Sequence, residues 1–562
     1  MPGFEPRTRT HALTRLADTV LDVLVVGGGI TGAGVAREAA LRDLTVGLVE
    51  ARDFASGTSS RSSKLIHGGI RYLAQGEVGL VREAARERTI LRQIAPHLTT
   101  QVPMLLPVYG RTSAGVYKLR VGLTLFDKLA AVPPDERHRV LSRNDALAAE
   151  PLLAPERLQG AAVYPEYVTD DARLVLDTLK SAHHAGAAIV NYVRVSALGE
   201  SDGLRTVDVR DETNGDTFTI RAKVVVNAGG PWVDQLGRLE ATAAPLRLHL
   251  SKGIHIVLRA DALPIHHCVV LPTVDGRSAF IVPRGRHLYI GTTDTSYEGT
   301  LDEPPVTAED VEYLLAALRR TLPTPPLGED DVVGTWAGVR PLVHEEGKSP
   351  SEISRKDEIY VSERGLVTIA GGKLTTYRRM AERVLETCAP QLGRRFLRST
   401  SGTIPLAGGD LGGAADLTSW AAATRVRSAL EGVPADTAQR LIAVHGSDAL
   451  EVIACAIGPA DLKPLADRVP LTRAEVRHAV RKEMAATLTD VLERRARIAL
   501  FETNAAREVA PVVAELMARE LGWKAERVAT ELESFARQCE SRLAWRESAE
   551  RRSTDVGRET HT

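Results

Sequence analysis

Residues 22–50 have the sequence DVLVVGGGITGAGVAREAALRDLTVGLVE, in which two apolar runs enclose a glycine-rich turn and a helical stretch. The apolar run at residues 23–26 predicts a buried parallel strand that passes directly into Gly27-x-Gly29-x-x-Gly32, with a helix expected over residues 33–42. In such a unit Gly27 permits the tight turn, Gly29 lets the backbone approach a pyrophosphate, and Gly32 lets the helix pack closely on the strand. The helix N-terminus then directs its free N–H groups at the phosphates.

A second apolar strand, expected over residues 45–49, ends in Glu50. This acid lies about 20 residues beyond the glycines, where a carboxylate accepts hydrogen bonds from an adenosine ribose. A glycine motif alone marks only a tight strand-to-helix connection. With the strand before it, the helix after it and the acid at the expected distance, it predicts dinucleotide binding.

The composition excludes several classes of protein. The 562 residues allow two or three domains, and 71 Lys and Arg residues almost balance 72 Asp and Glu residues, so no overall charge favours nucleic acid. The four cysteines lie far apart without a Cys-x-x-Cys pair, which argues against a disulfide framework or a zinc site, and we predict no metal. Residues 1–20 lack a signal-peptide core, and no run approaches the ~18 apolar residues of a spanning helix. We therefore expect a cytoplasmic chain or one peripheral to a membrane.

Two later stretches repeat the pattern of strand, glycine pair and helix. They are KVVVNAGGPW at residues 223–232 and LVTIAGGKLTTY at residues 366–377, and both are expected to return the chain to the parallel sheet. A helix at residues 170–185 and a strand at residues 188–195 precede them. The nucleotide-binding domain is therefore predicted to be discontinuous.

The segments between and after these stretches differ in pattern. Short strands, with a hairpin at residues 284–286 and a helix at residues 308–321, predict an antiparallel domain; the strands are at residues 246–258, 268–272, 279–283 and 287–293. Residues 416–545 have helical periodicity and predict a separate domain, and residues 546–562 are expected to be disordered.

An apolar and basic segment at residues 116–129 allows two interpretations. Wound as a helix, it places Leu119, Leu123, Phe126 and Leu129 on one stripe, flanked by Lys118, Arg120 and Lys128. The stripe either packs in a core, with the lysines reaching solvent, or lies in the plane of a membrane. The sequence favours the core slightly.

Six motifs in this order resemble the FAD-dependent glycerol-3-phosphate dehydrogenases: the glycine fingerprint, SSKLIHGGIRYL at residues 62–73, NAGGPW at 227–232, GTTD at 291–294, GVRP at 338–341 and GGKLTTY at 371–377. The resemblance implies a respiratory flavoenzyme that oxidises sn-glycerol 3-phosphate to dihydroxyacetone phosphate and passes two electrons to a membrane quinone. It implies FAD as the cofactor, peripheral contact with the inner face of the cell membrane and no nucleic acid, and it is compatible with a homodimer.

The implied fold class is α/β, with three parts. A discontinuous FAD-binding domain with a Rossmann-type parallel sheet takes residues 18–98, 161–240 and 351–395. An inserted antiparallel, β-rich substrate domain takes residues 99–160 and 241–350, and an all-α C-terminal domain takes residues 410–545.

The Gly-, Ser- and Thr-rich loop at residues 51–64 is either a polar connection or a second set of cofactor contacts, and its position favours the second. Together with the glycine motifs it gives the predicted FAD contacts, which are Gly27, Gly28, Gly29, Gly32, Glu50, Thr58, Ser59, Ser60, Lys64, His67, Gly68, Val195, Gly229, Trp232, Gly371, Gly372, Leu374 and Thr375.

A phosphate monoester requires convergent cations, preferably arginines. Arg71 and Arg340 stand beside glycine motifs, and Tyr72 adds a donor. Oxidation of the alcohol also requires a base, and we choose His255, because it alternates with its neighbours Ile254 and Ile256 and so points to the opposite face. Lys373 is the alternative base, or steadies negative charge on the reduced flavin, and it also counts among the substrate contacts.

Three other functions compete with this one. An oxidase of the same fold and substrate would return electrons to oxygen, an amine or amino-acid oxidase would also use arginine, and a scaffold would bind flavin without catalysis. The motif context disfavours the amine oxidase, and reduction of the flavin by substrate would exclude the scaffold.

Overall fold

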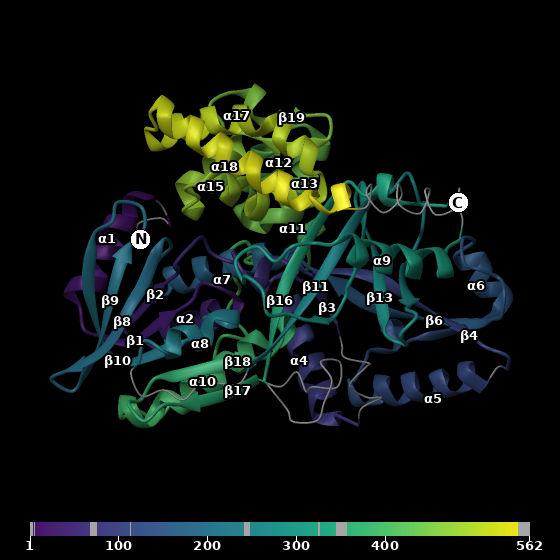
Figure 1. Ribbon diagram of the computed structural model, residues 1–562, viewed down its shortest axis with the longest axis horizontal. Helices are drawn as coiled ribbons and strands as arrows, with labels where there is room; N and C mark the ends of the chain where they lie inside the picture. Colours follow the sequence, from purple (N-terminus) through teal and green to yellow (C-terminus); the bar gives the residue numbers. More distant parts are fainter. Residues whose placement is uncertain are drawn as a thin grey trace, which may run out of the picture.

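The structure is a computed structural model that describes residue 4 and residues 6–67, 76–112, 114–240, 248–323, 326–343 and 357–548. Within these residues the chain forms a mostly parallel sheet, a larger and mostly antiparallel sheet beside it, and a helical domain that lies over both (Figure 1).

The parallel sheet, sheet A, is organised around β1 (Leu21–Val26), the strand that carries the glycine turn. Its strand path through the described residues is β17-β18-β10-β1-β2-β7, and β8 and β9 extend it beyond β10. The other strands are β2 (Val46–Val49), β7 (Ala188–Val190), β8 (Val193–Ser201), β9 (Leu204–Asp211), β10 (Thr217–Asn227), β17 (Asp357–Val361) and β18 (Val367–Gly371). β1 runs parallel to both β2 and β10, so the ends of all three strands meet at one edge.

Sheet A is covered on both faces, which explains why β1 is apolar without alternation. On one face lie α2 (Ile30–Ala40), α7 (Asp171–His184) and α10 (Tyr377–Leu392). On the other lie α1 (Pro6–Asp18) and the pair β8 and β9.

The antiparallel sheet, sheet B, contains ten strands within the described residues. They are β3 (Leu65–Ile66), β4 (Thr100–Tyr109), β5 (Arg139–Ser142), β6 (Leu158–Val168), β11 (Leu248–Arg259), β12 (Cys268–Pro272), β13 (Ser278–Arg284), β14 (His287–Gly291), β15 (Thr295–Ser296) and β16 (Gly334–Val343). The predicted hairpin is confirmed, because Arg284 of β13 pairs with His287 of β14. The predicted helix at residues 308–321 is α9 (Ala308–Thr321), which begins in a capping box between Thr307 and Asp310 and packs on sheet B.

The C-terminal domain has a hydrophobic core of its own. Its main helices are α11 (Leu417–Ala422), α12 (Thr424–Ala429), α13 (Ala435–His445), α14 (Ala449–Ala454), α15 (Arg473–Glu483), the π-helix η9 (Asp490–Arg495), α16 (Ile498–Phe501), α17 (Thr503–Leu521) and α18 (Ala525–Leu543), with a small sheet of β19 (Pro464–Ala466) and β20 (Val469–Thr472). Of the tail predicted to be disordered, Arg546 is described and donates to the Val332 carbonyl at 2.6 Å, and residues 549–562 lie outside the described residues.

Two predicted elements differ from the structure. The strand expected at residues 188–195 is broken, because Tyr192 adopts a φ of 57° between β7 and β8. The helix expected at residues 33–42 begins at Ile30, directly after the glycine turn. In the loop before β4, Pro96 opens a 3-10 turn (Pro96–Leu98) that ends the long helix α4 (Val78–Ile94).

Helix α5 (Ala114–Leu129) settles which face of the apolar and basic segment is covered. Leu123 and Phe126 are buried, and Phe126 packs against Val81 of α4. Three other apolar side chains of the helix are exposed, namely Tyr117 (70%), Val121 (53%) and Leu125 (47%). The two central residues of the predicted stripe, Leu123 and Phe126, therefore belong to the core, while Leu119 and Leu129 are half-buried. This burial disfavours a membrane contact through that stripe.

No helix among the described residues combines the length and the apolar character needed to cross a membrane.

Candidate active site

A cavity of about 640 Å³ lies where the carboxyl ends of the sheet A strands meet sheet B. It is lined both by the glycine turn and by β11, β16 and the loop after β14. The predicted FAD contacts that line it are Gly27, Gly29, Glu50, Thr58, Ser59, His67, Val195, Gly229, Trp232, Gly371, Gly372, Leu374 and Thr375.

The glycine turn, or glycine cradle, has no room for a side chain at two of its glycines. A Cβ atom at Gly27, where φ is 116°, would lie 2.5 Å from the Ala228 carbonyl oxygen, and one at Gly32 would overlap the carbonyl of Gly27. Gly29 is different, because a Cβ there meets only the Ser59 hydroxyl at 3.2 Å and otherwise faces the cavity. The first N–H groups of α2 lie beside Gly29, and that of Ile30 donates to the Ser59 hydroxyl at 3.0 Å. This arrangement fits a pyrophosphate.

Glu50 braces the same turn. Its carboxylate accepts the N–H of Gly28 at 2.7 Å and the N–H of Arg52 at 2.9 Å, and the residue lines the cavity. Burial raises the pKa of Glu50, and the two N–H groups oppose that rise.

Four predicted FAD contacts do not line the cavity: Gly28, Gly32, Ser60 and Lys64. The side chain of Lys64 does not reach the cavity, and its FAD contact stays a prediction. Its side chain is fully buried, and its ammonium donates to Asp171 at 2.7 Å and to the Ser60 carbonyl at 2.8 Å. Burial lowers the pKa of Lys64 to about 8. Gly68, Arg71 and Tyr72 lie outside the described residues.

His255 points into the cavity from β11, while Ile254 and Ile256 point into the core, as the alternation predicts. Its ring stacks on Trp336 with centroids 4.8 Å apart and an angle of 12°. Nε2 lies 2.9 Å from the Ser63 hydroxyl, and Nδ1 is buried without a hydrogen-bond partner among the described residues. Burial, then the charges of Arg340 and Lys64, hold the pKa of His255 well below its usual value. The imidazole is therefore neutral and able to accept a proton.

Arg340 reaches the same cavity from β16, where it pairs in register with Ser251 of β11. Its guanidinium donates to the Thr292 hydroxyl at 2.8 Å and to the Asp294 carboxylate at 3.2 Å. It passes over Gly253, where a Cβ atom would lie 2.7 Å from the guanidinium carbon. A glycine on β11 thus makes room for the arginine.

Lys373 also lines the cavity, at the start of the 3-10 turn Leu374–Thr376 that leads into α10. Gly371 and Gly372, with φ values of 76° and 86°, form the preceding turn. The structure therefore brings His255, Arg340 and Lys373 to one cavity.

Sequence reasoning missed several lining residues, among them Arg61, Ser63 and Arg277. Ser63 stands in the SSK motif, so its position was a usable signal. Arg277 has no such signal. It binds Asp275 at 2.7 Å and the Asp294 carbonyl at 2.6 Å, and so supports the loop that holds Arg340.

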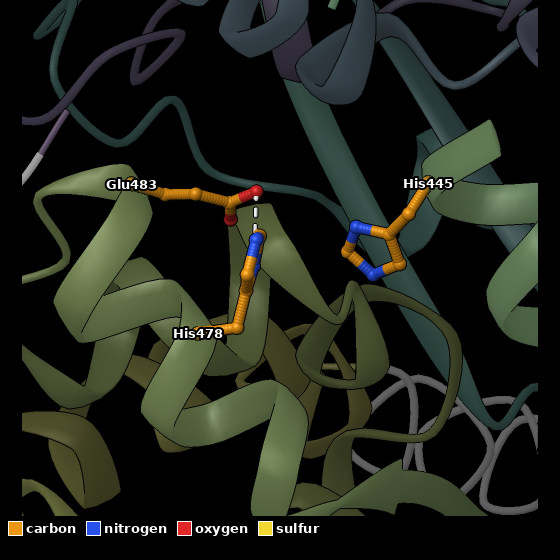
Figure 2. A group of neighbouring side chains, drawn as sticks. All are labelled: His445, His478 and Glu483. Atoms are coloured by element: carbon orange, nitrogen blue, oxygen red, sulfur yellow. Dashed lines mark ion pairs between the residues drawn. The ribbon is translucent and has the colours of Figure 1, made fainter. Parts of the chain in front are cut away.

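A second group of polar side chains, His445, His478 and Glu483, belongs to the C-terminal domain and does not line this cavity (Figure 2). Their ligand atoms lie within 4.8 Å of one another. The Glu483 carboxylate, however, is bound by both terminal nitrogens of Arg173. A carboxylate committed to a guanidinium is a poor metal ligand, so we assign this cluster to contact between the domains.

Comparison with known proteins identifies the family. A family model described as FAD dependent oxidoreductase matches residues 22–378, and one described as C-terminal domain of alpha-glycerophosphate oxidase matches residues 399–528. The aerobic glycerol-3-phosphate dehydrogenase of Staphylococcus haemolyticus is 40% identical over 89% of this chain and 91% of that protein. The chain belongs to the FAD-dependent glycerol-3-phosphate dehydrogenase family. The corresponding protein of Bacillus subtilis is 39% identical over 92% of this chain and 95% of its own length.

A solved structure supports both the fold and the cofactor of this glycerol-3-phosphate dehydrogenase family member. The glycerol-3-phosphate dehydrogenase from Bacillus halodurans, complexed with FAD, covers 96% of this chain and 98% of its own with a TM-score of 0.79 and 34% identity. The L-alpha-glycerophosphate oxidase from Mycoplasma pneumoniae shares the fold with a TM-score of 0.54 and 19% identity, over 69% of this chain and 99% of its own. The cofactor is FAD, and the glycine cradle and the braced Glu50 fit its dinucleotide part.

Proposed function

We propose that this flavoenzyme oxidises sn-glycerol 3-phosphate to dihydroxyacetone phosphate and passes the electrons to a membrane quinone. The observation that supports the substrate is the pairing of a buried neutral base, His255, with a guanidinium, Arg340, in one cavity beside the glycine cradle. A substrate with an alcohol and a phosphate needs these two groups together.

In this proposal Arg340 binds the phosphate, assisted by Lys373 and by Arg71 and Tyr72 of the SSKLIHGGIRYL motif. A guanidinium suits this task because its planar fork matches two phosphate oxygens. Asp294 and Thr292 hold the fork in place, so the substrate meets an oriented cation and little ordering is needed when it binds.

His255 takes the proton of the substrate hydroxyl at Nε2. We assign this atom because Nε2 is the nitrogen that reaches the cavity-lining Ser63 hydroxyl, while Nδ1 is buried. Stacking on Trp336 fixes the ring plane, and Gly291 of the neighbouring strand leaves room for it. FAD, when bound, would accept the hydride from the carbon that bears this hydroxyl, so that the alcohol becomes a ketone as its proton passes to His255.

The quinone requires a route to the membrane, and the exposed face of α5 offers one. Tyr117, Val121 and Leu125 lie at i, i+4 and i+8, on one side of the helix. Lys118, Arg120 and Lys128 are exposed beside them, and such cations favour anionic lipid. We propose this face as the membrane contact, in place of the buried stripe.

Vesicle co-sedimentation tests the membrane contact. Val121→Ser with Leu125→Ser should release the protein from anionic vesicles while melting temperature and dye reduction stay the same. Leu123→Ser is the matched control, because that side chain is buried and its loss should lower the melting temperature without changing vesicle binding. Unchanged binding of the double variant would contradict the assignment.

The competing acceptor is oxygen. The protein would be an oxidase if it formed one hydrogen peroxide for each substrate oxidised in air and did not reduce a short-chain quinone. Quinone reduction that continues without oxygen would support the proposal.

A further inference from the structure

The C-terminal domain contacts the loop at residues 50–64 that follows β2 and borders the cavity. The contact is made by η9 and by the residues around it. We infer that the C-terminal domain is a positioning element of the FAD site and that it acts through Arg494 and Arg495, which hold Asp53 in this loop. The inference concerns FAD binding and does not depend on the proposed substrate.

Asp53 is buried against cations of the other domain. Arg494 and Arg495 both donate to its Oδ2, and Arg495 also donates to its Oδ1 at 2.9 Å. Asn191 donates to Oδ1 at 3.2 Å. Burial raises the pKa of Asp53, but the two guanidiniums outweigh it and hold the pKa below its usual value. Because breaking a buried ion pair leaves an uncompensated charge, this loop depends on the arginines.

Asp53 is close in the chain to the residues that brace the glycine turn. The Ala55 N–H donates to the Gly28 carbonyl at 3.0 Å, and Glu50 accepts the Gly28 N–H at 2.7 Å. A Cβ atom at Gly28 would lie 2.8 Å from the Phe54 ring, so the loop packs directly on the turn. A shift of Asp53 would therefore be transmitted to the dinucleotide cradle.

The same part of the C-terminal domain reaches the far end of the loop. Glu493, which is 1% exposed, lies 3.5 Å from the guanidinium of Arg61, and Arg61 lines the cavity. Arg497 pairs with Asp170 at the start of α7. Residues 493–495 thus contact the loop near both of its ends, at Asp53 and at Arg61. These residues and the glycine turn match two different family models.

A double-mutant cycle on the holoenzyme tests the inference. The variants are Asp53→Asn, Arg495→Gln and the two together, with Arg519→Gln as the control, since Arg519 forms an exposed pair with Glu515 in the same domain. The release of FAD is followed by flavin fluorescence after dilution, and folding is followed by circular dichroism and by the melting temperature with and without added FAD.

We expect each single variant to release FAD at least about 10-fold faster than the parent, and the double variant to be no faster than the faster single, because both changes break one contact. We also expect added FAD to raise the melting temperature less in the variants than in the parent. Arg495→Lys, which retains the charge, should release FAD more slowly than Arg495→Gln does.

Two results would overturn the inference. In the first, both single variants melt at lower temperature but release FAD at the parent rate, so that the arginines stabilise the fold only. In the second, the effects of Asp53→Asn and Arg495→Gln on release add, so that they do not act through their contact. If Arg495→Gln does not fold, Asp53→Asn and Arg495→Lys decide the matter by the same release rates.

Discussion

Replacing Gly253 by alanine displaces the guanidinium of Arg340 without removing its charge. The added Cβ would lie 2.7 Å from the guanidinium carbon and 2.5 Å from the Thr292 hydroxyl, whereas ordinary contact begins at 3.4 Å. The nearest guanidinium atom, Nη2, would lie closer still, so the guanidinium must move by roughly 1 Å, a displacement large enough to matter for a group that orients a substrate.

The contact at risk is a charge-assisted hydrogen bond to phosphate, worth about 1.5–3 kcal/mol. Since about 1.4 kcal/mol is a factor of ten, kcat/KM for glycerol 3-phosphate should fall by about 10- to 150-fold. FAD content and melting temperature should stay close to those of the parent, because the change is at the substrate end of the cavity.

Steady-state kinetics with a dye acceptor measures the effect. Gly122→Ala is the matched control, because a Cβ there meets no atom within 4 Å. In an Arg340→Met background, Gly253→Ala should have little further effect, since its target is gone. If it lowered kcat/KM there as much as in the parent, or had no effect in the parent, Arg340 would not be the phosphate ligand.

Three further perturbations test other parts of the account. His255→Asn should retain FAD but slow the reduction of FAD by ~10² or more. The fall in rate at acid pH, which lies below pH 6.5 because the pKa of His255 is lowered, should disappear in this variant. An unchanged pH profile would transfer the role of base to Lys373. Gly29→Val should fold yet purify without yellow colour, since its side chain would fill the cradle; FAD at full occupancy would contradict the assignment. Burial lowers the pKa of His478 to about 3 from 6.5, so the unfolded chain takes up this proton first as the pH falls, and stability is lost from pH 6.5 downwards. At pH 5 this loss is about 2 kcal/mol, and denaturant unfolding at pH 7.5 and 5 should show a smaller loss for His478→Gln.

The parts of the fold that local chemistry controls could be predicted from the sequence. The helix at residues 308–321 matched because Thr307 and Asp310 cap it locally, and the hairpin at residues 284–286 matched because its turn is short. The break after β7 could not be predicted, because it depends on Tyr192, whose hydroxyl binds Asp490 of the C-terminal domain at 2.7 Å. Nor could the sequence show which face of α5 is covered, since its periodicity does not identify the neighbour.

The candidate site shows the same division. The alternation of β11 placed His255 correctly, because the side chains of a strand alternate whatever its partners are. The ion pair of Lys64 could not be predicted, because its partner, Asp171, is 107 residues away in the chain. The domain boundaries and the roles of Arg71 and Tyr72 stay predictions.

We propose that glycerol 3-phosphate delivers its electrons to the FAD of this protein. Anaerobic titration of the purified holoenzyme with glycerol 3-phosphate, monitored by the visible absorption of the flavin, tests this most directly. We expect the visible absorption of the flavin to be bleached completely after about one equivalent of glycerol 3-phosphate per FAD. Glycerol and a few amines should bleach none of it over the same range of concentration. A flavin that stays oxidised with glycerol 3-phosphate, or that glycerol or an amine reduces equally well, would contradict the account.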